Sequence, residues 1–186
     1  MSTIYLIRHG LTEANLRHLY CGSTDLPLSQ PGIAALEALK PQYRVPSACR
    51  FVTSGLLRTE QTLSLLFGDV PHDAVPDLRE MDFGIFEMGS YDSLKDTEAY
   101  QAWLRGDNEE NVAPGGESGS QMRARVLSAF KDIAAEDADT VIVTHGGVIS
   151  AIMQHLFPGE SKNRYAWQPA PGRGYAITGK TFVSIP

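Results

Sequence analysis

The sequence predicts an α/β protein: a three-layer sandwich whose mainly parallel central sheet is flanked by helices. Short apolar, β-branched segments alternate along the chain with longer segments of helical periodicity, and this alternation is typical of parallel sheets with helical crossovers. The segment Thr140–Thr144 has an apolar centre of Val141, Ile142 and Val143 between two β-branched threonines, as expected for a strand buried on both faces. No internal repeat or linker interrupts the 186 residues, so we expect a single domain over residues 1–186.

The first half of the chain predicts three strands and three helices. The strands are expected at residues 3–7, 51–53 and 71–75. Prolines flank the last of these, which favours an edge position in the sheet. The helices are expected at residues 12–19, 29–40 and 54–68. Ser29 and Ser54 are suitable N-caps for the second and third helices, and Gly68 is a natural end for the third.

The second half predicts a small helical cap followed by the rest of the sandwich. Residues 81–116, called the cap segment below, have no single strong periodicity, but residues 91–106 indicate two short helices and residues 108–116 a loop. We expect Tyr91, Tyr100 and Trp103 to pack as the core of this cap, with contact to the substrate as the alternative. Beyond it come a long helix over residues 117–135, the strand Thr140–Thr144, a helix over residues 148–157, and a hairpin of Gly174–Thr178 and Thr181–Ile185.

Composition excludes several classes of function. A formal net charge of −6 argues against wholesale nucleic-acid binding. No apolar stretch approaches the roughly 20 residues that cross a bilayer, and the N-terminus lacks the features of a signal peptide. Cys21 and Cys49 offer neither a disulfide framework nor zinc-ligand spacing. We therefore expect a cytoplasmic protein that does not act on a membrane, present as a monomer or a homodimer.

Two histidines follow predicted strands, and each is followed by glycine. One occurs in Arg8-His9-Gly10 and the other in His145-Gly146-Gly147. Ligand sites in open α/β sheets form outside the carboxyl ends of the strands, so these histidines should converge on one crevice. Glycine beside each histidine allows backbone and ligand to approach closely.

Further motifs occur between the two histidines, in a fixed order. They are Thr12 with Asn15; Gly22, Asp25, Pro27, Leu28 and Ser29; Thr53, Ser54, Leu56 and Arg58; and Leu78, Glu80, Phe83 and Gly84. With the two histidine motifs, this series resembles the histidine phosphatase superfamily, the group that contains phosphoglycerate mutases and small-molecule phosphatases. The resemblance covers residues 4–150. It departs from the family pattern at Cys21, where serine or another small residue is common, and at Thr59, where alanine is usual.

The resemblance implies roles for the matching residues. His9 would attack phosphorus, because histidine can form covalent intermediates. Glu80 would be the general acid and base, with Asp82 as its rival. Arg8, Arg58 and His145, helped by Asn15, would hold the phosphate oxygens, which is most of what phosphoryl transfer requires. The remaining candidates for substrate binding are Cys21, Gly22 and Gly146. With this set no metal and no cofactor is needed. The other histidines, His18, His72 and His155, lie outside these motifs, and we expect no direct role in catalysis for them.

Three functions are compatible with these residues: a phosphomonoester hydrolase, a phosphoglycerate mutase-type phosphotransferase, and a phosphate-binding module without turnover. A module is disfavoured because every catalytic residue type is present. Mutases of the family carry adjacent arginines in an insertion, and no two Lys or Arg residues are adjacent in this chain. The segments beginning at Tyr91 and Pro114 resemble the shorter phosphatase branch, which includes α-ribazole-phosphate phosphatases. Hydrolysis of a small phosphorylated metabolite is therefore the favoured function.

The cap segment is strongly acidic. It contains eight acids and two bases, a sum of −6 that equals the charge of the whole chain. If these acids overhang the pocket, their field should disfavour substrates with a second phosphate. The competing expectation is that the acids form a solvated outer face.

Overall fold

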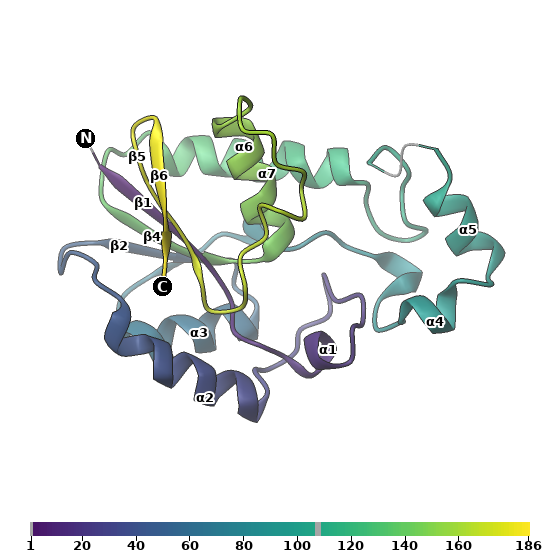
Figure 1. Ribbon diagram of the computed structural model, residues 1–186, viewed down its shortest axis with the longest axis horizontal. Coiled ribbons are helices and arrows are strands. Elements are labelled where there is room, and N and C mark those ends of the chain that lie inside the picture. The colour runs from purple at the N-terminus through teal and green to yellow at the C-terminus, as the bar shows by residue number, and fades with distance from the viewer. Residues whose placement is uncertain (1, 107–108) are drawn as a thin grey trace.

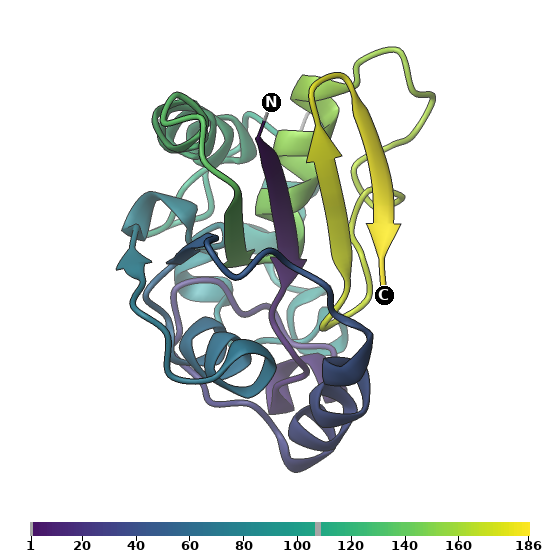
Figure 2. The ribbon, with the colours of Figure 1, turned by 90° about the vertical axis from the view of Figure 1, so that its left-hand side faces the viewer.

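The computed structural model describes residues 2–106 and 109–186. Its centre is a six-stranded sheet in the order β3-β2-β4-β1-β5-β6. The strands are β1 (Thr3–Arg8), β2 (Arg50–Thr53), β3 (Asp73–Ala74), β4 (Thr140–Thr144), β5 (Gly174–Thr178) and β6 (Thr181–Ile185). The first four in this order are parallel, β5 pairs antiparallel with β1, and β6 pairs antiparallel with β5. The mainly parallel sheet is thus confirmed (Figures 1 and 2).

Seven α-helices surround the sheet in the described part of the chain. They are α1 (Glu13–Leu16), α2 (Gln30–Leu39), α3 (Leu57–Phe67), α4 (Tyr91–Leu94), α5 (Glu98–Leu104), α6 (Gly119–Ala134) and α7 (Gly146–Leu156). Short 3-10 turns occur at Lys40–Gln42, Pro76–Leu78 and Gly84–Phe86. None of the described helices is long and apolar enough to span a membrane.

The strands β1 and β4 carry apolar side chains to both faces of the sheet. Leu6 and Ile142 belong to one buried cluster, together with residues of α6 and α7. Their neighbours Ile7 and Val143 belong to a second cluster, with residues of α2 and α3. Successive side chains of a strand point to opposite faces, so both faces need a helical layer. Figure 1 shows α6 and α7 above the strands and α2 and α3 below them, which confirms the three-layer sandwich.

Three helices begin at residues other than those predicted. The third helix starts at Leu57 with Leu56 as its N-cap, so Ser54, the predicted cap, lies two residues before the cap position, where its hydroxyl accepts from the N–H of Leu56 at 3.4 Å. The long helix α6 is capped by Ser118, whose side chain accepts from the backbone of Gln121. The last helix begins directly after His145, because both glycines that follow this histidine adopt helical conformations.

The first helix is a single turn instead of the predicted eight residues. Thr12 and Asn15 form a reciprocal capping box at its start. His18 has a φ of 53°, which a right-handed helix does not continue. The chain therefore leaves α1 at Arg17 and runs on as the loop that carries Cys21.

The cap segment forms two short helices, as predicted, beyond the carboxyl ends of β1 and β4 (Figure 1). Tyr100 and Trp103 are buried among other aromatic rings, including Tyr20 and Phe86. Tyr91 is 58% exposed, so its predicted place in the core of the cap is wrong. It lies in the first turn of α4, on the side that faces solvent. Asp107 and Asn108, two residues of the predicted cap, lie outside the described residues.

Candidate active site

The two histidines that follow strands lie side by side. Arg8 and Thr144, which precede them, are register partners in the parallel pair β1–β4, and the backbone N–H of His9 donates to the carbonyl of Thr144 at 2.9 Å. The two rings therefore meet at the carboxyl edge of the sheet. Their centroids are 5.1 Å apart, with an interplanar angle of 63°.

The ring of His9 is held in one tautomer. Its Nδ1 lies 2.7 Å from the carbonyl oxygen of Gly10, and because a carbonyl only accepts, Nδ1 must be the protonated nitrogen. Burial first, and then the positive charge of Arg58, lower the pKa of His9 to about 3. The imidazole is therefore neutral near pH 7, with the lone pair of Nε2 available as a nucleophile.

His145 is positioned by a residue for which the sequence suggested another role. Its Nε2 lies 2.9 Å from the hydroxyl of Ser54, and that hydroxyl also contacts Thr59 at 3.2 Å. Burial and the neighbouring His9 and Arg58 hold the pKa of His145 well below its usual value. Ser54 was predicted as a helix cap, but in the fold it orients this second histidine.

Glu80 is anchored at the N-terminus of α7. Its Oε2 accepts from the backbone N–H of Gly147 at 2.9 Å, and its Oε1 accepts from the N–H of Met81 at 3.0 Å. A Cβ atom at position 147 would lie 2.3 Å from Oε1, so only glycine allows this approach. The carboxyl group lies in the wall of the same cavity as His9.

The rival acid, Asp82, is directed elsewhere. Its Oδ1 accepts from the N–H of Gly84 at 2.8 Å and from the hydroxyl of Ser23 at 3.1 Å. Asp82 lines a second cavity, which Glu80 also borders, but it does not line the cavity that contains His9. The geometry therefore favours Glu80 as the proton donor.

Arg8 faces the cavity from the end of β1. Its Nη1 donates to the carbonyl of Pro169 at 2.9 Å, and burial lowers its pKa. The guanidinium packs against Gly146, where a Cβ atom would lie 3.2 Å from Cζ. Gly146 also lines the cavity. Arg8, which was predicted to bind the phosphate, and Gly146 therefore lie on the same wall.

Arg58 is almost fully buried, at 1% exposure, and lies outside the cavity wall. Its guanidinium donates to the carbonyls of Gly22 and Thr24, at 2.8 and 2.9 Å. Its positive charge adds to the larger effect of burial in lowering the pKa values of both histidines. A direct contact between Arg58 and phosphate stays a prediction.

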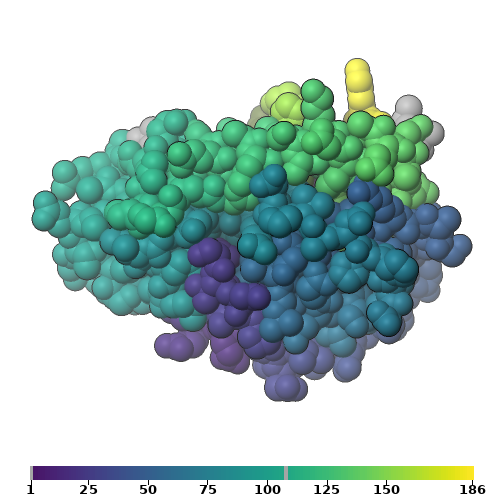
Figure 3. Space-filling view, turned by 180° about the vertical axis from the view of Figure 1, so that it is seen from behind, coloured from purple at the N-terminus to yellow at the C-terminus, as the bar shows by residue number. Residues whose placement is uncertain are grey.

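The loop of residues 21–24, whose carbonyl groups bind Arg58, also binds Glu87 through its backbone N–H groups. The carboxylate of Glu87 accepts from the backbone N–H groups of Gly22, Ser23 and Thr24. No role for Glu87 was predicted from the sequence. Figure 3 shows the N-terminal segment, in purple, lodged between the teal cap segment and the blue region of α3. Gly22 therefore positions the loop, and it is the neighbouring Cys21 that lines the cavity.

Asn15 and Cys21 complete the predicted set. The Oδ1 of Asn15 accepts from the backbone and hydroxyl groups of Thr12, both at 3.0 Å, so its amide nitrogen is the atom suited to donate toward a ligand. Burial raises the pKa of Cys21, which keeps the thiol protonated near neutral pH. Both residues line the cavity.

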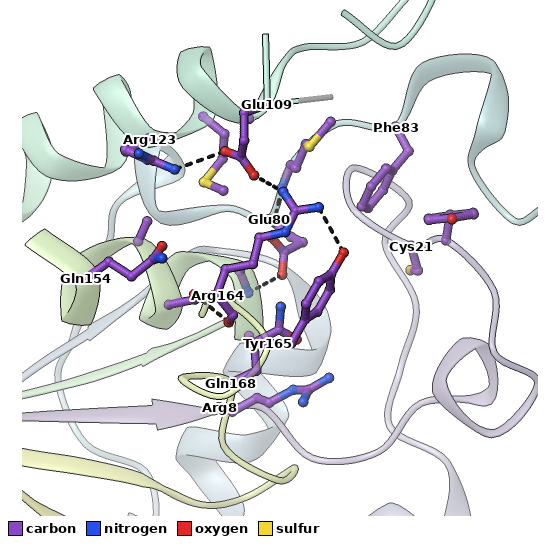
Figure 4. A pocket seen from close by; sticks show the side chains of 18 of the residues that line it. Arg8, Cys21, Glu80, Phe83, Glu109, Arg123, Gln154, Arg164, Tyr165 and Gln168 are labelled. Atoms are coloured by element: carbon purple, nitrogen blue, oxygen red, sulfur yellow. Dashed lines mark hydrogen bonds and ion pairs between the residues drawn. The ribbon is translucent and has the colours of Figure 1, made fainter. Parts of the chain in front are cut away.

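The cavity has a volume of about 340 Å³. Beyond the predicted residues, the cavity wall includes polar side chains for which the sequence predicted no role in binding. They are Glu109, Arg123, Gln154, Arg164, Tyr165 and Gln168. These come from the cap segment, from α6, from α7 and from the loop between α7 and β5, and they share no local motif. Figure 4 shows Glu109 and Arg123 on the opposite side of the view from Arg8.

The predicted negative field at the pocket is not supported by this arrangement. Among the acids of the cap segment that the structure describes, only Glu109 lines the cavity, and it forms ion pairs with Arg123 and Arg164. Asp92, by contrast, has a side chain that is 87% exposed. The described acids therefore lie mostly on a solvated face, while arginines join the pocket wall.

No described group of three or more His, Cys, Asp or Glu side chains is placed to hold a metal ion. The end of the cavity near His9 instead combines this neutral, buried nucleophile with Arg8 and the carboxyl group of Glu80. His145 lies beside the ring of His9 but is not part of the cavity wall. Such a set can bind a phosphate, form a bond to phosphorus and transfer a proton.

Comparison with known proteins agrees with this chemistry. Residues 4–177 match the family model of the histidine phosphatase superfamily (branch 1). The chain is 34% identical over 160 residues to the adenosylcobalamin/alpha-ribazole phosphatase of Salmonella typhimurium, covering 82% of this chain and 78% of that protein. It is 28% identical over 167 residues to a 2,3-bisphosphoglycerate-dependent phosphoglycerate mutase of Beijerinckia indica, covering 82% and 80%.

A solved structure shows the same fold. The alpha-ribazole phosphatase of Shigella flexneri superposes with a TM-score of 0.85 at 28% identity, covering 99% of this chain and 94% of the other. The family model spans nearly all of the described sheet and both histidines. The chain is therefore a member of the histidine phosphatase superfamily, branch 1.

Proposed function

We propose that this protein is a metal-independent phosphomonoester hydrolase that works through a phosphohistidine on His9. The observation that carries the proposal is the state of His9: a neutral imidazole, its Nδ1 proton held by Gly10 and its Nε2 left as a nucleophile in a cavity that also contains Arg8 and Glu80.

The first chemical step forms a bond between Nε2 of His9 and phosphorus while the ester P–O bond breaks. Glu80, in its protonated form, gives its proton to the leaving alkoxide. Arg8, with the charge of Arg58 behind it, stabilises the negative charge on the phosphoryl oxygens, and His145 lies beside the ring that receives phosphorus. Preorganised positive groups of this kind are a large part of phosphoryl-transfer catalysis.

The second step reverses the roles. Glu80, now a carboxylate, takes a proton from water as the water oxygen attacks phosphorus, and the N–P bond breaks. The sum of the two steps is ester plus water giving alcohol plus phosphate, with His9 and Glu80 restored. General acid–base help of this kind contributes roughly 10²–10⁴-fold.

The test is turnover and trapping in excess chelator. Phenyl phosphate should be hydrolysed at full rate with a chelator present, and an alkaline quench during turnover should leave one phosphoryl group on His9. His9→Ala should abolish both signals while keeping the circular dichroism of the parent. His155→Ala, on an exposed histidine, should behave as the parent.

Two results would overturn the proposal. Near-normal turnover in His9→Ala would rule out a phosphohistidine intermediate on His9. Loss of activity in chelator that is restored by a divalent cation would assign the charge stabilisation to a metal.

Transfer of the phosphoryl group to a second phosphorylated molecule is the alternative function. Arg123 and Arg164 in the pocket wall favour it, because guanidinium groups bind anions readily. The phosphorylated enzyme distinguishes the two: a hydrolase releases phosphate to water, whereas a mutase transfers it faster to added phosphoglycerate.

A further inference from the structure

The end of the cavity away from Arg8 contains three charged side chains in direct contact. Glu109 accepts through Oε2 from Nη2 of Arg123 at 2.9 Å, and its Oε1 pairs with Nη1 of Arg164. Arg164 also donates to the hydroxyl of Tyr165 at 2.9 Å. These contacts join the cap segment, α6 and the loop before β5 across the pocket (Figure 4).

This cluster carries a surplus of positive charge. One carboxylate lies between two guanidinium groups, so the three side chains sum to +1. Glu109 and Arg164 are partly withdrawn from solvent, with exposed side-chain fractions of 27% and 34%, whereas Arg123 is more exposed, at 46%. Partial burial weakens screening by water and salt, so the surplus charge acts on a ligand in the cavity.

The chemistry of this cluster favours a ligand group that accepts hydrogen bonds. Arginine has donors only and cannot lose its proton in proteins. Both oxygens of Glu109, the acceptor of the cluster, are already engaged by these arginines. A ligand group that reaches this end of the cavity is therefore bound best when it is an anion with two oxygens in one plane, which matches the guanidinium fork.

Given the proposed hydrolase, which this inference presupposes, the phosphate of the substrate occupies the end near Arg8 and His9. We infer that Arg123 and Arg164 form a second anion subsite, and that the preferred substrates are phosphomonoesters whose leaving alcohol bears a carboxylate or a further anionic group. Glu109 holds the two arginines in place and competes with the ligand for them.

Two matched pairs of substrates test the subsite. Phenyl phosphate is compared with 4-carboxyphenyl phosphate, and glycerol 1-phosphate with 3-phosphoglycerate, so that each pair differs chiefly by a carboxylate. In at least one pair kcat/KM should favour the carboxylate by about tenfold, the size expected of one charge-assisted hydrogen bond. Raising the salt concentration should reduce this ratio.

Substitutions test whether the cluster of Glu109, Arg123 and Arg164 causes this ratio of kcat/KM values. Arg123→Gln and Arg164→Gln should each bring the ratio toward one, whereas Glu109→Gln should raise it by releasing both arginines. Lys131→Gln removes a positive charge from an exposed position on the same helix as Arg123, and it should leave the ratio unchanged.

The outcomes separate this subsite from the hydrolase itself. Binding of the same four compounds to His9→Ala, measured by calorimetry, reports the carboxylate preference without turnover. Absence of hydrolysis with the preference retained would reject the hydrolase and keep the subsite. A ratio of one or less in both pairs, or a ratio that the arginine variants do not change, would reject the subsite.

Discussion

Two carboxyl groups two residues apart, Glu80 and Asp82, have different surroundings. Glu80 is held by backbone N–H groups in the cavity wall. Asp82 is occupied by Gly84 and Ser23 outside it. Sequence proximity alone does not separate them, but only a group that reaches the leaving oxygen can act as its acid.

Substitution of each acid should show the difference. Glu80→Gln should lower kcat for alkyl phosphates by roughly 10²–10⁴-fold, and much less for p-nitrophenyl phosphate, whose leaving group scarcely needs a proton. Asp82→Asn is the matched control and should not change the ratio of the two rates. If instead Asp82→Asn shows the leaving-group dependence and Glu80→Gln does not, the roles are exchanged.

At the scale of elements, α6 supports the turn that carries Glu80. Arg125, on this helix, donates to the carbonyls of Asp77, Arg79 and Glu80, at 2.8, 2.8 and 3.0 Å. Its guanidinium also pairs with Glu117. Arg125 is not part of the wall of the main cavity. We therefore regard it as a positioning residue for the acid.

Arg125→Gln should therefore impair proton transfer more than phosphate binding. We expect kcat for alkyl phosphates to fall by about tenfold, within the range of general acid catalysis, with a smaller loss for p-nitrophenyl phosphate and little change in KM. Arg17→Gln, at an exposed arginine, is the control. An equal loss for both classes of substrate, tracking a lowered melting temperature, would mean that Arg125 only stabilises the fold.

At the scale of the whole molecule, the two buried histidines make stability depend on pH. Burial lowers the pKa of His9 to about 3 and holds that of His145 well below its usual value. Below about pH 6.5, the ordinary value for histidine, the unfolded chain takes up protons that the folded protein does not. The free energy of unfolding should therefore fall as the pH falls, by up to about 1.4 kcal/mol per pH unit for each histidine.

Urea unfolding at pH 7.0 and 5.5 measures this slope. The exposed His72 acts in the opposite sense, because its hydrogen bond with the carbonyl of Val70 and its pairing with Glu60 raise its pKa. The double variant His9→Gln/His145→Gln should lose less stability on acidification than the parent. An identical loss in both proteins would show that other groups cause the dependence.

Much of the fold could be predicted because its signals are local. The segment that became β4 and the alternation of strands with helices both follow from neighbouring residues. The convergence of His9 and His145 follows once both strands are placed in one parallel sheet, because ligand sites form at the carboxyl ends of such strands. Helix starts were less predictable. Ser54 has the residue type of an N-cap, but its hydroxyl is used by His145, which is 91 positions away in the sequence.

The sequence by itself determined the order of the motifs and the two histidines after strands, because strand ends and turns are set by short-range patterns. The choice of Glu80 over Asp82 as the acid came from the family resemblance and stays a prediction. Only the tertiary structure decided which groups share the cavity. It placed Arg123, Glu109 and Arg164 together from three separate segments, and it turned most acids of the cap segment that it describes toward solvent. Such contacts depend on how distant elements pack, since no local pattern encodes the direction of a side chain across a pocket.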